Sequence, residues 1–384
     1  MLGEGSVSAT FARHLRSATN YVIRYGTVLL VRHKASGRLY AQKQLKKATI
    51  VVHKKVIEQT KTERAILESV QHPNVVKLYY AFQDHEKLYL ILEYVALLPI
   101  LSLPHILTIS RYAEGGELFH HLAETTMFCE DTAAYYIAQL VLALSHLHQN
   151  VGVVYRDLKP ENCLLDASGQ LLLTDFGLSK VSSEYSRCSS LLGTPGYMAP
   201  EVLSDDGSEY GAEVDWWGVG ILAFELLTGK LPFEGNSPEK VKLKIQKRKL
   251  QLPSYLSTDA KDFITRLLRK EPNKRLGYNL AKDLPTIKAH RFFRKIDWTL
   301  LEARELTPPI QPLVTDPLLA ENFSAEFTEL PLSPRVGNGF PVGWGRGERE
   351  EKQDPFGGFS FVATSLLEEQ FLKEGLLGGS PGER

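Results

Sequence analysis

The chain has 384 residues, with 45 Lys and Arg against 45 Asp and Glu, so its formal net charge is zero. This balance argues against a protein held on nucleic acid or on a membrane by bulk charge, although a local patch is still allowed. Apolar residues at 43% and charged residues at 23% are typical of a globular protein and exclude wholesale disorder or a fibrous repeat. The three cysteines, Cys129, Cys163 and Cys188, have a spacing that favours neither a disulfide scaffold nor a structural zinc site. We therefore expect a reducing, intracellular compartment.

The first part of the chain is predicted to form β-strands and one helix. Apolar runs at residues 28–31 and 39–43 are separated by the turn residues Ser36-Gly37, and residues 87–92 form a further predicted strand. The helix is predicted over residues 54–70.

One apolar segment, residues 88–109, has the length of a membrane-spanning helix. It contains Glu93 and two prolines, however, and it begins with the pattern of a strand. An acid and two prolines are costly within a bilayer, so we predict no membrane span.

The periodicity changes to that of helices from residue 131. Ile137, Leu140, Val141 and Leu144 recur at i, i+3, i+4 and i+7, which predicts a helix buried along one face. Further helices are predicted over residues 216–228 and 259–268. The sequence becomes irregular after about residue 293, and residues 336–347 are rich in glycine. A β-rich part followed by a larger helical part predicts an α+β fold of two lobes, with an extended tail.

The strongest chemical signal consists of three motifs in a fixed order. They are residues 155–162, Tyr-Arg-Asp-Leu-Lys-Pro-Glu-Asn, then Asp175-Phe176-Gly177, then Ala199-Pro200-Glu201. This order and spacing resembles the catalytic loop, metal-binding loop and segment end of protein kinases. A chance run of charged surface residues would not reproduce all three motifs.

Phosphoryl transfer requires a positioned hydroxyl group and neutralisation of charge, and these residue types supply both. Asp157 is the expected acceptor of the substrate hydroxyl proton, and Lys159 would neutralise the moving phosphoryl group. Asn162 and Asp175 offer the hard oxygen ligands that Mg²⁺ prefers. Upstream, Lys43 is expected to bind ATP phosphates and to pair with Glu63; taken alone, each would be read as a solvated charge.

The chain resembles a Ser/Thr protein kinase of the AGC group, nearest the ribosomal-protein-kinase (RSK) branch, over residues 2–362. Marks of the group are Tyr155, residues 215–218 (Asp-Trp-Trp-Gly) and residues 271–277 (Glu-Pro-Asn-Lys-Arg-Leu-Gly). The tail carries residues 356–361, Phe-Gly-Gly-Phe-Ser-Phe, which resemble the hydrophobic motif of the group, and residues 332–334, Leu-Ser-Pro, which resemble its turn motif.

The resemblance implies a bilobal protein-kinase domain over residues 1–293, with a small lobe over about 1–116 and a large lobe over about 117–293. An AGC tail follows over residues 294–373, and a disordered terminus over 374–384. The implied cofactors are ATP and Mg²⁺. The implied location is cytoplasmic or nuclear, and no nucleic-acid partner is expected.

The resemblance also assigns site residues beyond the catalytic motifs. The expected ATP-binding residues are Gly3, Gly5, Gly26, Val28, Lys43, Glu63, Glu93 and Glu117. The expected substrate-recognition residues are Glu117, Glu161, Glu225 and Thr194. The three acids favour protein substrates with arginine N-terminal to the acceptor. The alternative for each acid is an ordinary solvated or ribose-facing carboxylate.

Regulation is predicted through the tail and through phosphorylation. The expected phosphosites are Ser190, Ser333 and Ser360. Phe356, Phe359 and Phe361 are expected to dock in a groove of the small lobe, where Lys54, Lys55 and Lys61 are candidate partners of a phosphate on Ser360. The alternative is that the tail is free and only recruits an upstream activating kinase. Glu201 and Arg275 are expected to form an ion pair.

Two departures from the family pattern stand out. Residues 7–24 interrupt the glycine loop, and residues 94–111 interrupt the hinge; each block is 18 residues long. Removing the first block restores Gly-Glu-Gly-Ser-Tyr-Gly-Thr-Val. We hypothesise that both blocks are non-coding sequence carried into the translation; genuine insertions are the alternative.

The interruptions leave a second function class open, a catalytically inactive pseudokinase that acts as a scaffold. Against it stands the presence of Lys43, Asp157 and Asp175, which pseudokinases usually lose. A small-molecule phosphotransferase is a weaker third reading, because residues 193–195 and 199–201 resemble elements that bind protein substrates.

Overall fold

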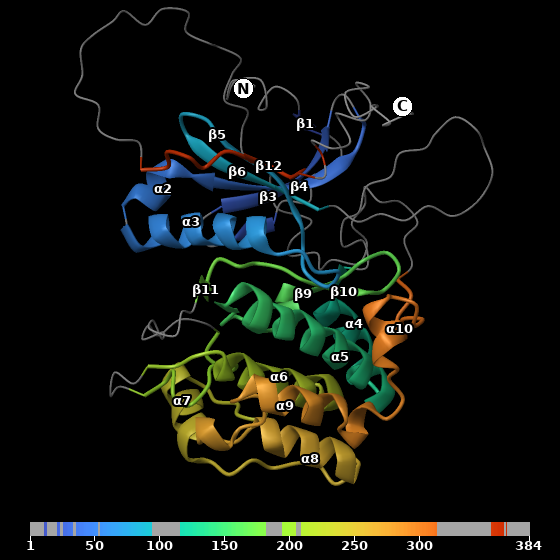
Figure 1. Cartoon of the computed structure of the whole chain (residues 1–384). Helices are drawn as coiled ribbons and strands as arrows, with labels where there is room; N and C mark the ends of the chain where they lie inside the picture. The colour runs from blue at the N-terminus through green and yellow to red at the C-terminus, as the bar shows by residue number, and fades with distance from the viewer. Residues whose placement is uncertain are drawn as a thin grey trace, which may run out of the picture.

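The computed structural model describes residues 11–13, 21–23, 26–33, 36–52, 54–93, 116–181, 194–204, 209–312, 355–364 and 366. These residues form two lobes, a sheet with two helices and a larger helical part (Figure 1). The predicted α+β bilobal kinase fold is confirmed.

The small lobe is built on a sheet in the order β1-β3-β4-β6-β5-β12, with β2 also pairing with β3. Strands β3 (Gly26–His33), β4 (Leu39–Lys46) and β6 (Lys87–Leu92) lie where the sequence predicts strands, and β5 (Leu78–Gln83) is a fourth long strand that was not predicted. The remaining strands are short: β1 (Phe11–Arg13), β2 (Tyr21–Ile23) and β12 (Phe361–Val362). The last strand comes from the tail, far along the chain from its neighbour β5.

Two helices, α2 (Lys47–Val51) and α3 (Lys54–Ser69), accompany the sheet (Figure 1). Ile66 and Leu67 of α3 belong to the main hydrophobic core together with Leu88 and Leu90 of β6. A separate cluster packs elsewhere on the strands and consists of Leu29, Val31, Tyr40, Phe82 and Ile91. Because both faces of the sheet are covered, β4 and β6 are mostly buried, and β6 is apolar at every residue after Lys87 rather than strictly alternating.

The large lobe contains the helices α4 (Leu118–Thr125), α5 (Glu130–His146), α6 (Glu213–Thr228), α7 (Pro238–Lys247), α8 (Thr258–Leu267), α9 (Leu280–Lys288) and α10 (Trp298–Glu302). Serine caps start two of them, because the Ser237 and Ser257 hydroxyls accept hydrogen bonds from Lys240 N and Ala260 N. Helix α6 ends at Gly229, whose φ of 67° is in the left-handed region that favours glycine.

Two sequence expectations for this lobe were wrong. Helix α5 was expected to bury one face, but all its residues from 133 to 145 are buried, because α6, α9, β10 and the 3-10 turn Arg291–Phe293 surround it. The region after residue 293 was expected to be irregular, but residues 298–302 of it form α10. Asp297 caps that helix by accepting hydrogen bonds from the backbone N–H groups of Thr299 and Leu300.

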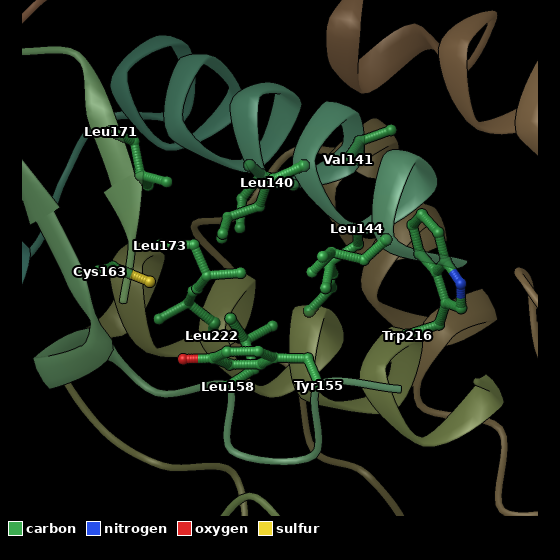
Figure 2. Packing of buried hydrophobic residues seen from close by; sticks show 14 of the residues in the cluster. Leu140, Val141, Leu144, Tyr155, Leu158, Cys163, Leu171, Leu173, Trp216 and Leu222 are labelled. Atoms are coloured by element: carbon green, nitrogen blue, oxygen red, sulfur yellow. The ribbon is translucent and has the colours of Figure 1, made fainter. Parts of the chain in front are cut away.

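Five short strands accompany the helices in the described part of the large lobe. They are β7 (Gly116–Glu117), β8 (Val153–Val154), β9 (Cys163–Leu165), β10 (Leu171–Leu173) and β11 (Lys180–Val181). Figure 2 shows Leu140 and Leu144 of α5 packed with Leu173 of β10 and with Tyr155 and Leu158. The loop between β8 and β9 is therefore seated directly on the core of the large lobe.

Among the residues that the structure describes, no helix combines the length and the apolar character that crossing a bilayer requires.

Candidate active site

The loop after β8 is fixed by one buried carboxylate from α6. Asp215, 1% exposed, accepts hydrogen bonds from the backbone N–H groups of Tyr155 (2.8 Å) and Arg156 (2.7 Å), and its Oδ2 lies 2.8 Å from His148 Nε2. Arg156 has a φ of 70°, which is uncommon for a residue with a side chain. The two bonds to Asp215 hold this backbone conformation, which sets the direction of the next residue, Asp157.

Asp157 is the centre of a dense polar cluster. Its Oδ2 accepts a hydrogen bond from Asn162 Nδ2 (3.0 Å) and lies 3.0 Å from Lys159 Nζ. Its Oδ1 accepts from the Thr194 hydroxyl (3.3 Å), which also accepts from Lys159 Nζ (3.3 Å). Burial raises the pKa of Asp157, and Lys159 and Asn162 oppose that increase. A positioned carboxylate of raised pKa suits a group that accepts a proton.

A second cluster joins the two lobes. Lys43 on β4 and Glu63 on α3 are both buried, and Lys43 Nζ lies 2.6 Å from Glu63 Oε1 and 3.1 Å from Asp175 Oδ1. Burial disfavours the charged form of Lys43, but the carboxylates of Asp175 and Glu63 outweigh it, so the pKa of Lys43 is raised. Lys43 in turn lowers the pKa of Asp175 despite burial. The predicted Lys43–Glu63 contact is thus present.

The metal-binding loop is anchored next to this pair. Phe176 is fully buried with its ring 5.3 Å from that of Tyr155, whose hydroxyl donates to the Thr174 carbonyl. A Cβ on Gly177 would lie 3.2 Å from Asp175 Oδ1 and 3.7 Å from Glu63 Oε2. Glycine therefore leaves room for two carboxylates to approach Lys43.

The donor set fits Mg²⁺ and a nucleotide phosphate. Lys43 keeps Asp175 ionised, and the side chain of Asp175 is 39% exposed, so it is open to a ligand. Asn162 uses Nδ2 to donate to the carbonyl and to the carboxylate of Asp157, which leaves its amide oxygen as the ligand atom. Amide and carboxylate oxygens are the ligands that Mg²⁺ takes beside phosphates.

Two of the predicted substrate-recognition acids lie together. The Tyr197 hydroxyl donates to Glu225, which is 8% exposed. Burial raises the pKa of Glu225 to about 7; the Tyr197 hydrogen bond opposes the increase and the nearby charge of Glu161 adds to it. Glu161 Oε2 is buried and has no hydrogen-bond partner among the residues that the structure describes. Glu117 lies on β7 opposite Leu164, but its side chain is outside the described residues.

Glu201 and Arg275 form the expected ion pair. Arg275 Nη1 and Nη2 donate to the two carboxylate oxygens of Glu201 at 2.5 and 2.8 Å, and the Arg275 side chain is fully buried. Its Nη1 also donates to the Glu213 carbonyl (2.9 Å), and its guanidinium lies over the Trp217 ring. This pair ties the end of the segment that follows Thr194 to the start of α6.

The tail aromatics lie against the small lobe. Phe356 and Phe359 are buried at 1% and 3% exposure, and both belong to the main core cluster. Phe361 pairs with Ala81 as β12 extends the sheet beside β5, and its ring lies under the guanidinium of Arg64, 5.6 Å away.

Polar contacts fix the same segment. Gln83 Nε2 donates to the Phe356 carbonyl (3.3 Å), and Arg64 Nη2 donates to the Ser360 carbonyl (3.3 Å). Arg64 is next to Glu63 on α3, so the tail contacts the helix whose Glu63 pairs with Lys43. Among the three predicted lysines, Lys61 is exposed on α3, and the side chains of Lys54 and Lys55 are outside the described residues.

The structure places the other predicted site residues as follows. Gly26 and Val28 lie on β3, and Glu93 follows β6, where its N–H donates to the Lys77 carbonyl (2.7 Å). Strands β1 and β2 fall within the block 7–24 and pair with β3. Gly3, Gly5, Ser190, Ser333 and the block 94–111 lie outside the described residues.

Sequence reasoning missed several residues that shape the site. Asp215 was noted as part of a group motif, without its role as the acceptor for the catalytic loop. Tyr197, Arg64 and Lys47, whose Nζ lies 5.6 Å from the centroid of the Phe356 ring, were not identified. Acids in a mostly apolar helix were the available signal for Asp215, which shares α6 with Glu213 and Glu225. No local pattern marks Tyr197, Arg64 or Lys47.

The protein kinase domain family matches residues 24–108 and 100–293, and the protein kinase C terminal domain family matches residues 314–361. The two parts of the kinase-domain match overlap at residues 100–108, which lie inside the block 94–111.

Among curated proteins, the chain is 43% identical over 349 residues to "Ribosomal protein S6 kinase alpha-1" of Homo sapiens, covering 90% of this chain and 43% of that protein. It is 42% identical over 353 residues to "Ribosomal protein S6 kinase 2 beta" of Xenopus laevis (91% and 51%). It is 42% identical over 349 residues to "Ribosomal protein S6 kinase beta" of Caenorhabditis elegans (90% and 58%). The chain thus spans between about two fifths and three fifths of the length of these relatives. The chain belongs to the protein kinase family, and it is an AGC-group member similar to the ribosomal protein S6 kinases.

Proposed function

We propose that this chain transfers the γ-phosphoryl group of ATP to Ser or Thr hydroxyls of proteins. The observation that carries the proposal is the convergence of two clusters, Lys43–Glu63–Asp175 from both lobes and Asp157–Lys159–Asn162 from the catalytic loop. A pseudokinase is not favoured, because Lys43, Glu63 and Asp157 are all present. Lys43 pairs with Glu63, and Asp157 lies beside Lys159.

Each residue has a distinct task in this proposal. Glu63 orients Lys43 so that its ammonium contacts nucleotide phosphate oxygens, and Asp175 and Asn162 supply oxygen ligands to Mg²⁺. When bound, Mg-ATP supplies the phosphoryl group and neutralises much of its charge. Asp157 accepts the hydrogen bond of the substrate hydroxyl and then its proton, and Lys159 stabilises charge on the transferred group.

Protein substrates with arginine N-terminal to the acceptor are the proposed class. Glu161 and Glu225 form a partly buried acidic pair, and a buried carboxylate without a hydrogen-bond donor is a suitable partner for a guanidinium. The position after Gly177 is Leu178, which favours serine over threonine as the acceptor. An upstream kinase that docks on the tail, and a cytoplasmic or nuclear location, stay predictions.

Radiolabelled ATP and a serine peptide with arginines at −3 and −5 test the proposal. The matched control is the same peptide with glutamines in place of the arginines. We expect transfer to the first peptide, weaker transfer to the second, and none without Mg²⁺. The assay is run on the chain as it stands and on a form that lacks both 18-residue blocks.

Comparison of the chain with and without the two blocks distinguishes an active kinase, a kinase that the blocks inhibit, and an inactive scaffold. Activity only in the shortened form would mean that the blocks inhibit the enzyme, in agreement with the hypothesis that they are non-coding. Nucleotide binding without transfer in either form would favour the scaffold. Sequencing of the mature transcript tests the hypothesis about the blocks directly.

A further inference from the structure

Although the chain has no net charge, its basic residues are unevenly distributed. Within residues 240–249 the sequence reads Lys-Val-Lys-Leu-Lys-Ile-Gln-Lys-Arg-Lys, which holds six basic residues and no acidic one. These residues belong to α7 (Pro238–Lys247), whose first turn also holds the exposed acid Glu239, and to the turn after it, in the large lobe. The candidate active site does not use them. A concentration of one sign of charge on an otherwise balanced protein indicates a local binding surface.

The arrangement on α7 separates a buried face from an exposed one. Ile245 is fully buried and Val241 packs against the core, so this side of the helix faces the protein. Lys240, Leu243 and Lys247 are spaced by three and four residues and therefore share the opposite face. All three are exposed, and Leu243 has 50% of its surface accessible.

Lys249, just beyond the helix, is also exposed. We call Lys240, Leu243, Lys247 and Lys249 the α7 patch. In the part of the chain that the structure describes, the three lysines of the patch take part in no ion pair. Neighbouring cations differ: Lys244 Nζ donates to the Glu234 carbonyl, and Lys270 Nζ donates to the Gln246 and Arg248 carbonyls at 3.1 and 2.6 Å. The lysines of the patch are thus available, while others hold the helix in place.

The patch is connected to the segment that bears on protein substrates. Gln246 Nε2 of α7 donates to the carbonyl of Leu203 at 3.1 Å, two residues beyond Glu201. Glu201 is held by Arg275, so α7 is attached to the end of the same segment that places Thr194 beside Asp157. A protein bound at α7 would therefore lie on the lobe that also presents the catalytic loop.

We propose that the α7 patch is a docking site for an acidic segment of protein substrates, one that carries an apolar residue to cover Leu243. Charge complementarity selects the acidic partner, and the exposed leucine between lysines selects an apolar anchor. This inference rests on the proposed kinase function. It adds a specificity element separate from Glu161 and Glu225, with the opposite preference in charge.

A protein partner fits this surface better than a membrane or a nucleic acid. A helix of ten residues is about 15 Å long, and the single leucine among the lysines of its exposed face offers far less apolar surface than a helix that lies in a membrane presents. Single-stranded nucleic acids stack on aromatic side chains, and residues 238–249 contain none.

The test uses three peptides that share one arginine-containing acceptor sequence. The first is the acceptor alone; the second adds, through a flexible linker, an acidic extension with a central leucine; the third has the same extension with glutamine and asparagine in place of its acids. The full chain is compared with Lys240→Glu/Lys247→Glu and with the control Lys274→Glu/Lys282→Glu, which reverses two exposed lysines elsewhere on the large lobe.

We expect the acidic extension to lower KM by about tenfold for the unchanged chain and for the control, with kcat unchanged, because a tenfold change in affinity is within the range of a few charge pairs and one apolar contact. The charge reversal at α7 should remove this gain and leave KM for the bare acceptor as it was. Added salt should reduce the gain, since these charges are exposed.

A binding measurement keeps the test independent of kinase activity. Fluorescence anisotropy of a labelled acidic extension without any acceptor should detect binding to the full chain and not to the α7 reversal, even if the protein transferred no phosphate. Equal KM values for the three peptides, or equal losses in the α7 and control variants, would overturn the proposal. Binding of anionic vesicles or of a DNA oligonucleotide through the same lysines, with no binding of the acidic peptide, would overturn it as well.

Discussion

Two regions bring the reacting groups together, and they are held in different ways. The catalytic loop is fixed within its own lobe, where Asp215 accepts hydrogen bonds from Tyr155 and Arg156 and the loop packs on the core below it. Helix α3, which carries Glu63, also depends on a segment almost 300 residues away, because Arg64 contacts Ser360 and Phe361. In the structure the catalytic loop is fixed by contacts within the large lobe, whereas the helix that carries Glu63 also contacts the tail. We therefore expect the position of Glu63 to depend on the tail.

We therefore expect docking of the tail on the small lobe to affect activity. The tail buries Phe356 and Phe359 and adds β12 to the sheet. Such contacts are made or lost as a unit when the tail docks or leaves. No comparable long-range segment, within the described residues, holds the catalytic loop.

The largest expected effect is on chemistry alone. Asp157→Asn removes the proton acceptor but no nucleotide ligand, so we expect phosphoryl transfer to fall by about 10²–10⁴-fold while ATP affinity changes little. Steady-state kinetics and nucleotide titration check this. The melting temperature should hardly change, and a variant with unchanged turnover would show that Asp157 is not the base.

The second prediction concerns the Glu201–Arg275 ion pair of the large lobe. Arg275→Ala leaves Glu201 without its partner, and removal of one member of a buried ion pair costs about 3–5 kcal/mol. We expect a lower melting temperature together with lower activity. Lys274→Ala is the matched control, because Lys274 is exposed and lies 3.6 Å from Glu271; equal melting curves for the two variants would contradict the prediction.

The third prediction concerns the tail segment that lies against the small lobe. Truncation after Pro355 removes β12 and the three tail aromatics, and burial of each Phe side chain contributes about 1.5–3 kcal/mol. In protein already phosphorylated on Ser190, we expect a large loss of activity and a lower melting transition of the small lobe. Truncation after Leu366 retains the docked segment and should keep both properties. Full activity after truncation after Pro355 would mean that the tail serves only to recruit an upstream kinase.

The smallest expected effect concerns substrate binding and pH. The pKa of Glu225 is about 7, so its carboxyl is mostly neutral below pH 7 and ionised above it. KM for an arginine-containing peptide should therefore fall several-fold, roughly in line with the ionised fraction, as pH rises from 6 to 8. Glu225→Gln should flatten this dependence and leave kcat unaffected. An identical pH profile in the variant would separate Glu225 from arginine recognition.

The sequence predicted the site unevenly, and the reason lies in the range of the interactions. Asp157, Lys159, Asn162 and Asp175 lie within about twenty residues, and their chemistry requires particular residue types at fixed spacing, so the motif was readable. Arg64 and Tyr197 act through partners far away in the chain, Ser360 and Glu225, and their own neighbours in sequence carry no sign of this.

By itself the sequence predicted the two-lobe α+β fold, three strands of the small lobe and four of the helices, because short-range pattern and helical period are local properties. Motif spacing and the resemblance to protein kinases gave the groups for phosphoryl transfer. Only the tertiary structure decided that α5 is buried on all sides, that Asp215 orients the catalytic loop and that the tail completes the sheet beside β5. Within the described residues, it also decided that Lys240, Lys247 and Lys249 take part in no ion pair, while Lys244 donates to the Glu234 carbonyl. These outcomes depend on packing between segments distant in sequence, where burial and competition for hydrogen-bond partners, rather than local propensity, fix the result.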